Sequence, residues 1–394
     1  MLSSLVLFLG AGASRPFGIP TMKELVPLFK KHLESNRKGN REIEEQCELY
    51  NDITTTAQDA HSLLFHRRQS HVDLESVFSI IDGLTKGDPS AGMSYYPYYY
   101  YLSTMDDSAR TEFLDVTGNF AEKTSAKVDI ARRLGATLED FLVESCIIKD
   151  DKMFDRLDIV FGDLFTKLGT REHALQTVGR QKYGTGNWVI HTTNYDTCVE
   201  SFCEQSEIPY NDGFEWNSQK REQVPNWGLL GKPGFKLIKL HGSIVWIDKQ
   251  GVGLTKQRVP AYRDLFGSRS AIGRMKFEGR RMIYPVDQKQ IFLDPQFHLY
   301  YRLKLDLASS PRWIIIGYSF NDPIITQIFQ EAYKQATDDL KNNPKVVIVH
   351  PEADRIKREK LVTFNDSVGF TLPITNRFGQ NEGAGVTDDM CRIL

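Results

Sequence analysis

The stretch Ser4–Leu9 (SLVLFL), followed at once by Gly10–Ser14 (GAGAS), is the clearest indication of the fold class. A short apolar run that ends at paired glycines is typical of a buried β-strand followed by a sharp turn. Thr21 and Glu24 stand three residues apart in the pattern of a capping box, which predicts that a helix begins there. We therefore predict a strand, a loop and a helix in succession at the start of the chain.

Further apolar runs rich in β-branched residues have the same character: Trp188–Thr192, Phe235–Leu240, Trp313–Gly317 and Lys345–His350. Helical periodicity lies between them, most clearly in Pro323–Ala336, whose apolar residues fall on one stripe of a 3.6-residue period. Strands that alternate with helices predict an α/β fold with a doubly wound, mostly parallel sheet. Ligands of such sheets bind at the carboxyl ends of the strands.

The long interval between the first two predicted strands contains helical stripes and no convincing strand. We therefore predict a large helical insertion over residues 38–180. The α/β core would then consist of residues 1–37 and 181–365. Residues 366–394 are rich in Gly, Asn and Asp and are interpreted as a C-terminal tail.

The composition is that of an ordinary globular protein, because hydrophobic residues make up 41% and charged residues 25% of the 394. A net charge of −2 provides no global field for nucleic acid or anionic lipid, and no apolar run is long enough to span a membrane. The N-terminus lacks the basic region of a signal peptide. The five cysteines include no Cys-x-x-Cys pair, which fits a reduced compartment. We expect a soluble cytoplasmic protein with no membrane association and no direct binding of nucleic acid.

The glycine loop after the first strand can be interpreted in two ways. Paired glycines at a strand end let the backbone approach a pyrophosphate, with its N–H groups directed at the anion. The alternative is a simple turn, since Gly10 and Gly12 lack the third glycine of the dinucleotide-binding fingerprint. The absence of a Walker A sequence argues against a P-loop ATPase.

Polar residues follow two more of the predicted strands. Asn194 and Asp196 come directly after Trp188–Thr192, where either side chain could bind a ligand or cap the next helix. His241 follows Phe235–Leu240 beside a glycine, where an exposed imidazole could act as a base near neutral pH. His191 lies inside an apolar strand, which favours a role in the core.

The last polar loop is Gly317–Pro323 (GYSFNDP). Asn321 or Asp322 as N-cap, with Pro323 at the first helical position, indicates a helix start. The functional alternative is that Ser319 and free N–H groups of this loop bind ribose hydroxyls or phosphate.

Together the loops GAGAS, TTNYD, KLHGS and GYSFND, in this order, resemble those of the sirtuin family, specifically the divergent bacterial sirtuin-like domains of anti-phage defence proteins. The resemblance covers approximately residues 1–37 and 185–350, and it implies a Rossmann-like core that binds NAD. It implies that Asn194 and His241 are catalytic. It assigns the pyrophosphate to Gly10, Ala11, Gly12 and Ser14, the nicotinamide–ribose pocket to Thr193, Asn194 and Asp196, and the adenosine half to Gly317, Tyr318, Ser319 and Asn321.

One departure from the family bears on the reaction. Protein-deacylating sirtuins carry a zinc ribbon between the histidine and the last loop, whereas Gly242–Trp313 contains no cysteine here. We therefore expect no zinc, and water as the acceptor, so that an NAD hydrolase releases nicotinamide and ADP-ribose. His241 would accept a proton and Asn194 would position water or a ribose hydroxyl. The alternatives are an NAD-dependent protein deacylase and a non-catalytic sensor of NAD or ADP-ribose.

The short chain resembles the sirtuin-like subunit that assembles with a HerA-type hexameric ATPase. The resemblance implies a homo-oligomer, partnership with such an ATPase, and NAD depletion in abortive anti-phage defence. The tyrosine run Tyr95–Tyr101 is a candidate interface or, equally, a packed helix. The basic stretch Arg263–Arg281 is interpreted as a solvated face or an interface, with nucleic-acid binding as the alternative.

Overall fold

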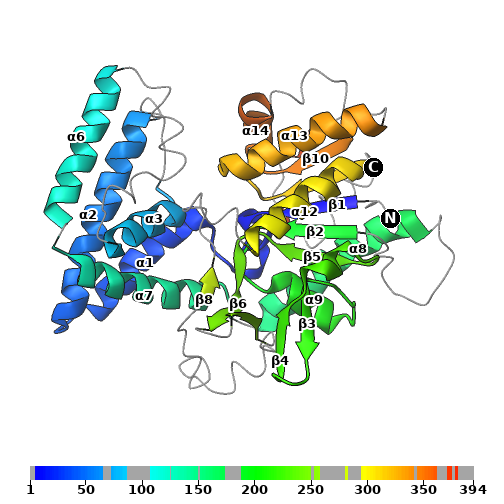
Figure 1. Ribbon diagram of the computed structural model, residues 1–394, viewed down its shortest axis with the longest axis horizontal. Coiled ribbons are helices and arrows are strands. Elements are labelled where there is room, and N and C mark those ends of the chain that lie inside the picture. The colour runs from blue at the N-terminus through cyan, green and yellow to red at the C-terminus, as the bar shows by residue number, and fades with distance from the viewer. Residues whose placement is uncertain are drawn as a thin grey trace. The chain divides into compact units, whose positions relative to one another are not determined.

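The computed structural model divides the chain into two compact units (Figure 1). The core unit consists of Met1–Ile19, Cys146–Met282 and Phe292–Leu394, and the helical unit consists of Pro20–Ser145 and Ile283–Ile291. The structure describes residues 5–64, 72–86, 107–124, 126–149, 151–173, 188–249, 253–257, 280–282, 294–340, 344–361, 371–374 and 378–379.

A six-stranded sheet forms the centre of the core unit, in the order β11-β10-β9-β1-β2-β5. Every neighbouring pair in it is parallel. Its strands are β1 (Leu5–Leu9), β2 (Trp188–Thr192), β5 (Lys236–Lys239), β9 (Arg312–Ile316), β10 (Lys345–Val349) and β11 (Thr371–Ile374). This arrangement confirms the predicted α/β fold with a parallel sheet.

Helices cover both faces of this sheet. On one face Leu5, Leu7 and Leu9 of β1 share a core cluster with residues of α8 (Asp151–His173) and α9 (Cys198–Gln205). On the other face the Phe8 ring lies 5.0 Å from the ring of Phe329 in α13 (Pro323–Leu340), which packs beside α12 (Gln296–Ser309). Both faces of β1 are therefore buried, which is why its residues read as a continuous apolar run.

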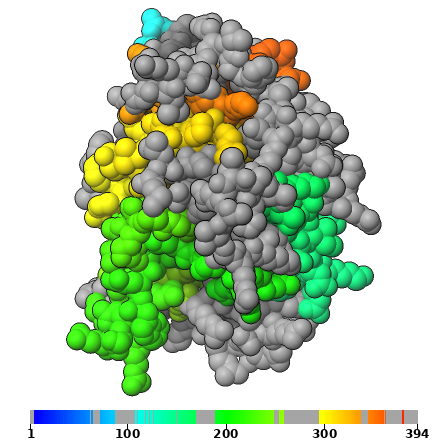
Figure 2. All heavy atoms as spheres, turned by 90° about the vertical axis from the view of Figure 1, so that its right-hand side faces the viewer, coloured from blue at the N-terminus to red at the C-terminus, as the bar shows by residue number. Residues whose placement is uncertain are grey.

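A second, antiparallel sheet was not predicted. Its order is β3-β4-β7-β6-β8, and β6 begins immediately after His241. Its strands are β3 (Phe214–Asn217), β4 (Glu222–Pro225), β6 (Gly242–Lys249), β7 (Gly253–Lys256) and β8 (Arg280–Met282). The rings of Phe214 in β3 and Trp246 in β6 pack 5.1 Å apart. The green residues of this region, including the β3–β4 hairpin, project at the lower edge of the surface in Figure 2.

The helical unit contains α1 (Met22–Asn36), α2 (Arg41–Leu64), α3 (Leu74–Thr85), α6 (Asp107–Thr124) and α7 (Val128–Ser145). Its α1 begins with the predicted capping box, in which Thr21 N donates to Glu24 Oε2 at 2.9 Å. The apolar face of α1 includes Phe29, whose ring lies 5.1 Å from that of Tyr50 in α2. Among the helices that the structure describes, none has both the length and the apolar character needed to cross a membrane.

The unit boundaries differ from the predicted ones. The helical unit begins at Pro20 and ends at Ser145, whereas the insertion was predicted over residues 38–180. The helix α8 lies inside that range but belongs to the core unit, because its apolar stripe, with Phe161 and Phe165, packs against the parallel sheet. A helical stripe shows which face is buried and not what it is buried against.

The structure describes only part of the predicted C-terminal tail and of the segments singled out by composition. Residues 371–374, inside the predicted tail, form the edge strand β11, with Thr371 paired to Val346. The tyrosine run Tyr95–Tyr101 lies outside the described residues, as does Arg263–Arg281 apart from the backbone of Arg280 and Arg281 in β8.

Candidate active site

The carboxyl ends of four neighbouring strands bring the four predicted loops to one edge of the sheet. In the order β9-β1-β2-β5, each loop is joined to the next strand by backbone hydrogen bonds. Gly10 N donates to Ile316 O at 2.9 Å, Thr193 N to Leu9 O at 3.2 Å, and Leu240 N to Thr192 O at 2.8 Å. Segments nearly 200 residues apart in the chain thus meet at one rim, which is where such sheets bind ligands.

The glycine loop packs directly against the Gly317 loop. A Cβ at Gly10 would lie 2.6 Å from Gly317 O, and one at Gly12 would lie 2.7 Å from the Gly317 Cα. Gly317 itself has a φ of +66°, in the left-handed region that favours glycine. The three glycines therefore let two backbones touch.

Backbone N–H groups of the glycine loop are used for hydrogen bonds within the protein. Gly12 N donates to Gly317 O at 3.0 Å, and Ala13 N and Ser14 N donate to carbonyls within the loop. These N–H groups are therefore not directed at an anion, contrary to the reasoning from the sequence. The half-buried Ala11 and Gly12 remain the part of this loop that a ligand can reach.

Asn194 ties the second loop to the first. Its Nδ2 donates to Gly10 O and to Ser14 Oγ, both at 2.9 Å. Its Oδ1 is buried and has no hydrogen-bond partner among the residues that the structure describes. A buried acceptor without a partner is costly, and a ligand hydroxyl or a water would satisfy it. The structure therefore shows Asn194 joining two loops and not capping a helix.

Asp196 supports the start of the next helix. Its Oδ1 accepts a hydrogen bond from Cys198 N at 2.9 Å, at the first turn of α9. The side chain is buried. The sequence left open whether Asn194 or Asp196 would serve the helix, and the structure assigns this role to Asp196, whose carboxylate also forms a side-chain hydrogen bond with Cys198.

His241 is held by a carboxylate from the last loop. Its Nε2 lies 3.2 Å from Asp322 Oδ2, and both side chains are buried. The other oxygen of Asp322 caps α13, accepting from Ile324 N at 2.9 Å and Ile325 N at 3.1 Å. An ionised carboxylate only accepts hydrogen bonds, so this contact favours the tautomer of the neutral imidazole in which Nε2 carries the proton and Nδ1 the lone pair.

Asp322 is the site residue that the sequence analysis missed. The sequence predicts Asp322 only as a candidate cap for the helix beginning at Pro323, and it has this role. The additional contact with His241 joins residues that are 81 positions apart. No local pattern signals such a pair, since β1 and β2 lie between the strands that precede the two residues, although both follow the carboxyl ends of strands in one parallel sheet.

The remaining predicted residues of the last loop differ in their surroundings. The ring of Tyr318 packs against Phe8 at 4.7 Å and against Phe320 at 4.9 Å, on the core side of the loop. Ser319 is half-buried and Asn321 is exposed. A ligand at this rim therefore reaches the loop through Ser319 and Asn321 more easily than through the Tyr318 ring. Thr193, in the second loop, is also half-buried.

Nearby thiols take no part in acid–base chemistry. Burial raises the pKa of Cys146 and of Cys198, so both stay neutral at physiological pH. Within the described ranges, no group of three or more His, Cys, Asp or Glu side chains is arranged to hold a metal ion. That the protein binds no zinc stays a prediction.

The comparison with known families agrees with this geometry. Residues 189–369 match the SIR2-like domain. This SIR2-like region contains the second, third and fourth loops, including Asn194, His241 and Asp322, while the glycine loop precedes it. The match supports a sirtuin-like relationship and an NAD-related activity in general. No curated protein matches the chain.

Proposed function

We propose that this protein is an NAD glycohydrolase that cleaves the nicotinamide–ribose bond and releases nicotinamide and ADP-ribose. The proposal rests on two polar side chains, Asn194 and His241, that other residues hold in place at the rim of the sheet. Asn194 presents a buried Oδ1 that lacks a hydrogen-bond partner within the described part of the chain, and His241 Nε2 is held by the Asp322 carboxylate. The SIR2-like match supports NAD as the substrate.

The reaction places few demands on acid catalysis. The C–N bond between ribose and the cationic ring breaks with its electron pair going to the ring nitrogen, so nicotinamide leaves as a neutral molecule. The ribose passes through an oxocarbenium-like state, as in glycoside hydrolysis. Water then forms the new C–O bond and loses one proton. The site must therefore hold the ribose, place the water and accept that proton.

The chain's own residues can meet these needs. Asn194 Oδ1 would accept a hydrogen bond from the water or from a ribose hydroxyl, which orients the reacting groups. His241 Nδ1 would accept the proton, and the Asp322 carboxylate would stabilise the resulting imidazolium. The Asp196 carboxylate would accept a hydrogen bond from the carboxamide of nicotinamide.

The rest of NAD would lie along the loops at the same rim. Ala11 and Gly12 would contact the pyrophosphate, with Thr193 beside the nicotinamide ribose. The adenosine half would extend over the last loop. Its contacts there would be Gly317, Tyr318 through its backbone, Ser319 and Asn321.

Two variants test the assignment of roles. His241→Ala and Asn194→Ala should each reduce nicotinamide release by roughly 10²–10⁴-fold, because each removes a group that acts on the water or its proton. NAD binding to both folded variants, measured by calorimetry, should persist. Nicotinamide release at the normal rate by folded His241→Ala would remove this residue from the mechanism.

We also propose that this activity depletes NAD during anti-phage defence, under the control of assembly. The support is the resemblance of the four loops to sirtuin-like defence proteins and the presence of a separate helical unit. An unrestrained NAD hydrolase would harm its host, so specific activity should change on homo-oligomerisation and on mixing with a HerA-like hexameric ATPase. Light scattering with a parallel NAD assay would test this, and a fully active monomer without affinity for the ATPase would contradict it.

A further inference from the structure

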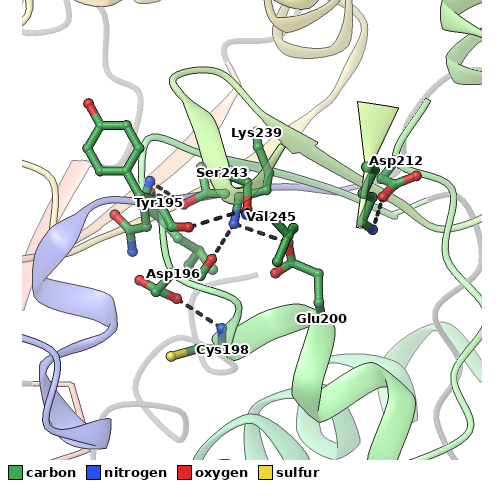
Figure 3. A network of polar contacts seen from close by, with 12 residues as sticks. Tyr195, Asp196, Cys198, Glu200, Asp212, Lys239, Ser243 and Val245 are labelled. Atoms are coloured by element: carbon green, nitrogen blue, oxygen red, sulfur yellow. Dashed lines mark hydrogen bonds and ion pairs between the residues drawn. The ribbon is translucent and has the colours of Figure 1, made fainter. Parts of the chain in front are cut away.

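The loop that carries Asn194 and Asp196 rests on a network of buried polar groups (Figure 3). Tyr195 O accepts hydrogen bonds from Ile244 N at 3.0 Å and from Ser243 Oγ at 3.3 Å. Asp196 O accepts a hydrogen bond from Lys239 Nζ. Two successive carbonyls of the loop are therefore fixed by residues from β5 and β6, which flank His241.

Lys239 stands at the end of β5 and is 3% exposed. Its ammonium also lies 3.1 Å from Glu200 Oε1 of α9, which is 1% exposed. In Figure 3 the lysine reaches the Asp196 carbonyl while Glu200 approaches from the helix. The pair thus joins a strand end, the loop and the helix that follows it.

Burying this pair is not an efficient way to stabilise a fold. Removing a lysine and a glutamate from water costs several kcal/mol each, and apolar side chains of similar volume often stabilise a core as well or better. The contact with Glu200 is an ion pair without the alignment of a hydrogen bond, since Oε1 has no hydrogen-bond partner among the described residues. The hydrogen bond that Lys239 donates to the loop goes to the Asp196 carbonyl.

We propose that Lys239 is a positioning residue that fixes the loop bearing Asn194 and Asp196, and that Glu200 orients the lysine. Neither side chain needs to touch the substrate. The catalytic consequence rests on the proposed NAD cleavage. A displacement of about 1 Å at a reacting group can lower a rate by about 10²-fold, so loss of this tether should lower kcat more than it raises KM.

The test uses Lys239→Met, together with the double variant Lys239→Met/Glu200→Met. The single variant leaves a buried carboxylate without its cation and can fail to fold, whereas the double variant replaces the pair with apolar side chains of similar length. The folded double variant should lose about 10²-fold in kcat with a change in KM for NAD of less than about threefold. A folded double variant with normal kcat would overturn the proposal.

A matched control separates positioning from general destabilisation. Lys256 of β7, in the antiparallel sheet, forms a similar ion pair with Asp212. Lys256→Met should lower thermal stability without lowering kcat by more than about threefold. An equal loss of kcat in Lys256→Met and Lys239→Met would contradict a specific role for Lys239.

Hydrogen exchange provides a readout that does not depend on the proposed function. In the double variant, amides of residues 193–198 should exchange at least tenfold faster, while those of β10 stay unchanged. Unchanged exchange across 193–198 would overturn the proposal even if the wild-type protein cleaves NAD. If the wild-type protein does not cleave NAD, faster exchange still supports the structural role of Lys239, and only the proposed reaction fails.

Discussion

At the scale of single residues, Asp322 shows how one carboxylate can serve both the fold and the site. Its Oδ1 accepts the first free N–H groups of α13, and its Oδ2 holds His241 Nε2. The helix N-terminus and the histidine are therefore fixed by the same side chain. A conservative substitution can separate these two functions.

Asp322→Asn should preserve the fold and reduce catalysis. The amide oxygen can still cap α13, because Asn is as good an N-cap as Asp. The neutral side chain cannot stabilise an imidazolium, so we expect nicotinamide release to fall by roughly 10²–10⁴-fold. Thermal unfolding and a product assay on the same preparation check both parts.

Asp322→Ala is the control for the capping role. It should also lose about 0.5–2 kcal/mol of stability, because the cap is removed. Full activity in Asp322→Asn would show that the carboxylate has no part in the reaction.

At the scale of elements, the sequence predicts strands well where they are buried on both faces. The strands β1, β2, β9 and β10 are continuous apolar runs, because helices cover them from both sides. The small strands of the second sheet have mixed sequences such as EQVP in β4, and pairing with neighbours stabilises them more than their own composition does.

The same distinction applies to the site. The rim loops were predictable, because polar residues directly follow apolar strands at Thr193 and His241. The contacts between the loops were not predictable from local patterns. The Asp322–His241 pair and the packing of Gly10 against Gly317 depend on strand order, which brings distant segments together.

Gly317→Ala tests the backbone contact between the two loops. The new Cβ would meet the backbone of Gly12 and Ala13, at a φ of +66° that alanine disfavours. We expect a loss of at least about 1–3 kcal/mol in the free energy of unfolding, measured in urea. Gly231→Ala is the control, because nothing lies within 4 Å of its added Cβ. Equal stability of the two variants would contradict the proposed packing.

At the scale of the whole molecule, a buried histidine makes stability depend on pH. His191 Nε2 lies 3.1 Å from Asp306 Oδ2, and Arg302 also pairs with Asp306. Burial lowers the pKa of His191 below its ordinary value, and the positive charges of Arg302 and Lys236 lower it further. The hydrogen bond to Asp306 acts in the opposite direction and raises this pKa. Burial by itself raises the pKa of Asp306, but hydrogen bonds from His191 and Arg302 outweigh it and hold that pKa low.

Both shifts destabilise the folded protein in acid. A histidine kept neutral in the fold stabilises it fully above about pH 6.5, and this contribution is lost as the pH falls below that value. The contribution of Asp306 is lost only as the pH falls below about 4. His191→Gln, which can still donate to Asp306, should therefore reduce the slope of unfolding free energy between pH 7 and 5 by up to about 1.4 kcal/mol per pH unit. An unchanged slope would show that His191 binds a proton equally in both states.

The most direct test of the central claim is product analysis after incubating the purified wild-type protein with NAD, with and without an acetyl-lysine peptide. We predict nicotinamide and ADP-ribose in equal amounts, at a rate that the peptide does not change. The reason is that Gly242–Trp313 contains no cysteine for a zinc ribbon. Release of nicotinamide only with the peptide, together with O-acetyl-ADP-ribose, would contradict the hydrolase and identify a deacylase. Intact NAD under every condition would contradict both.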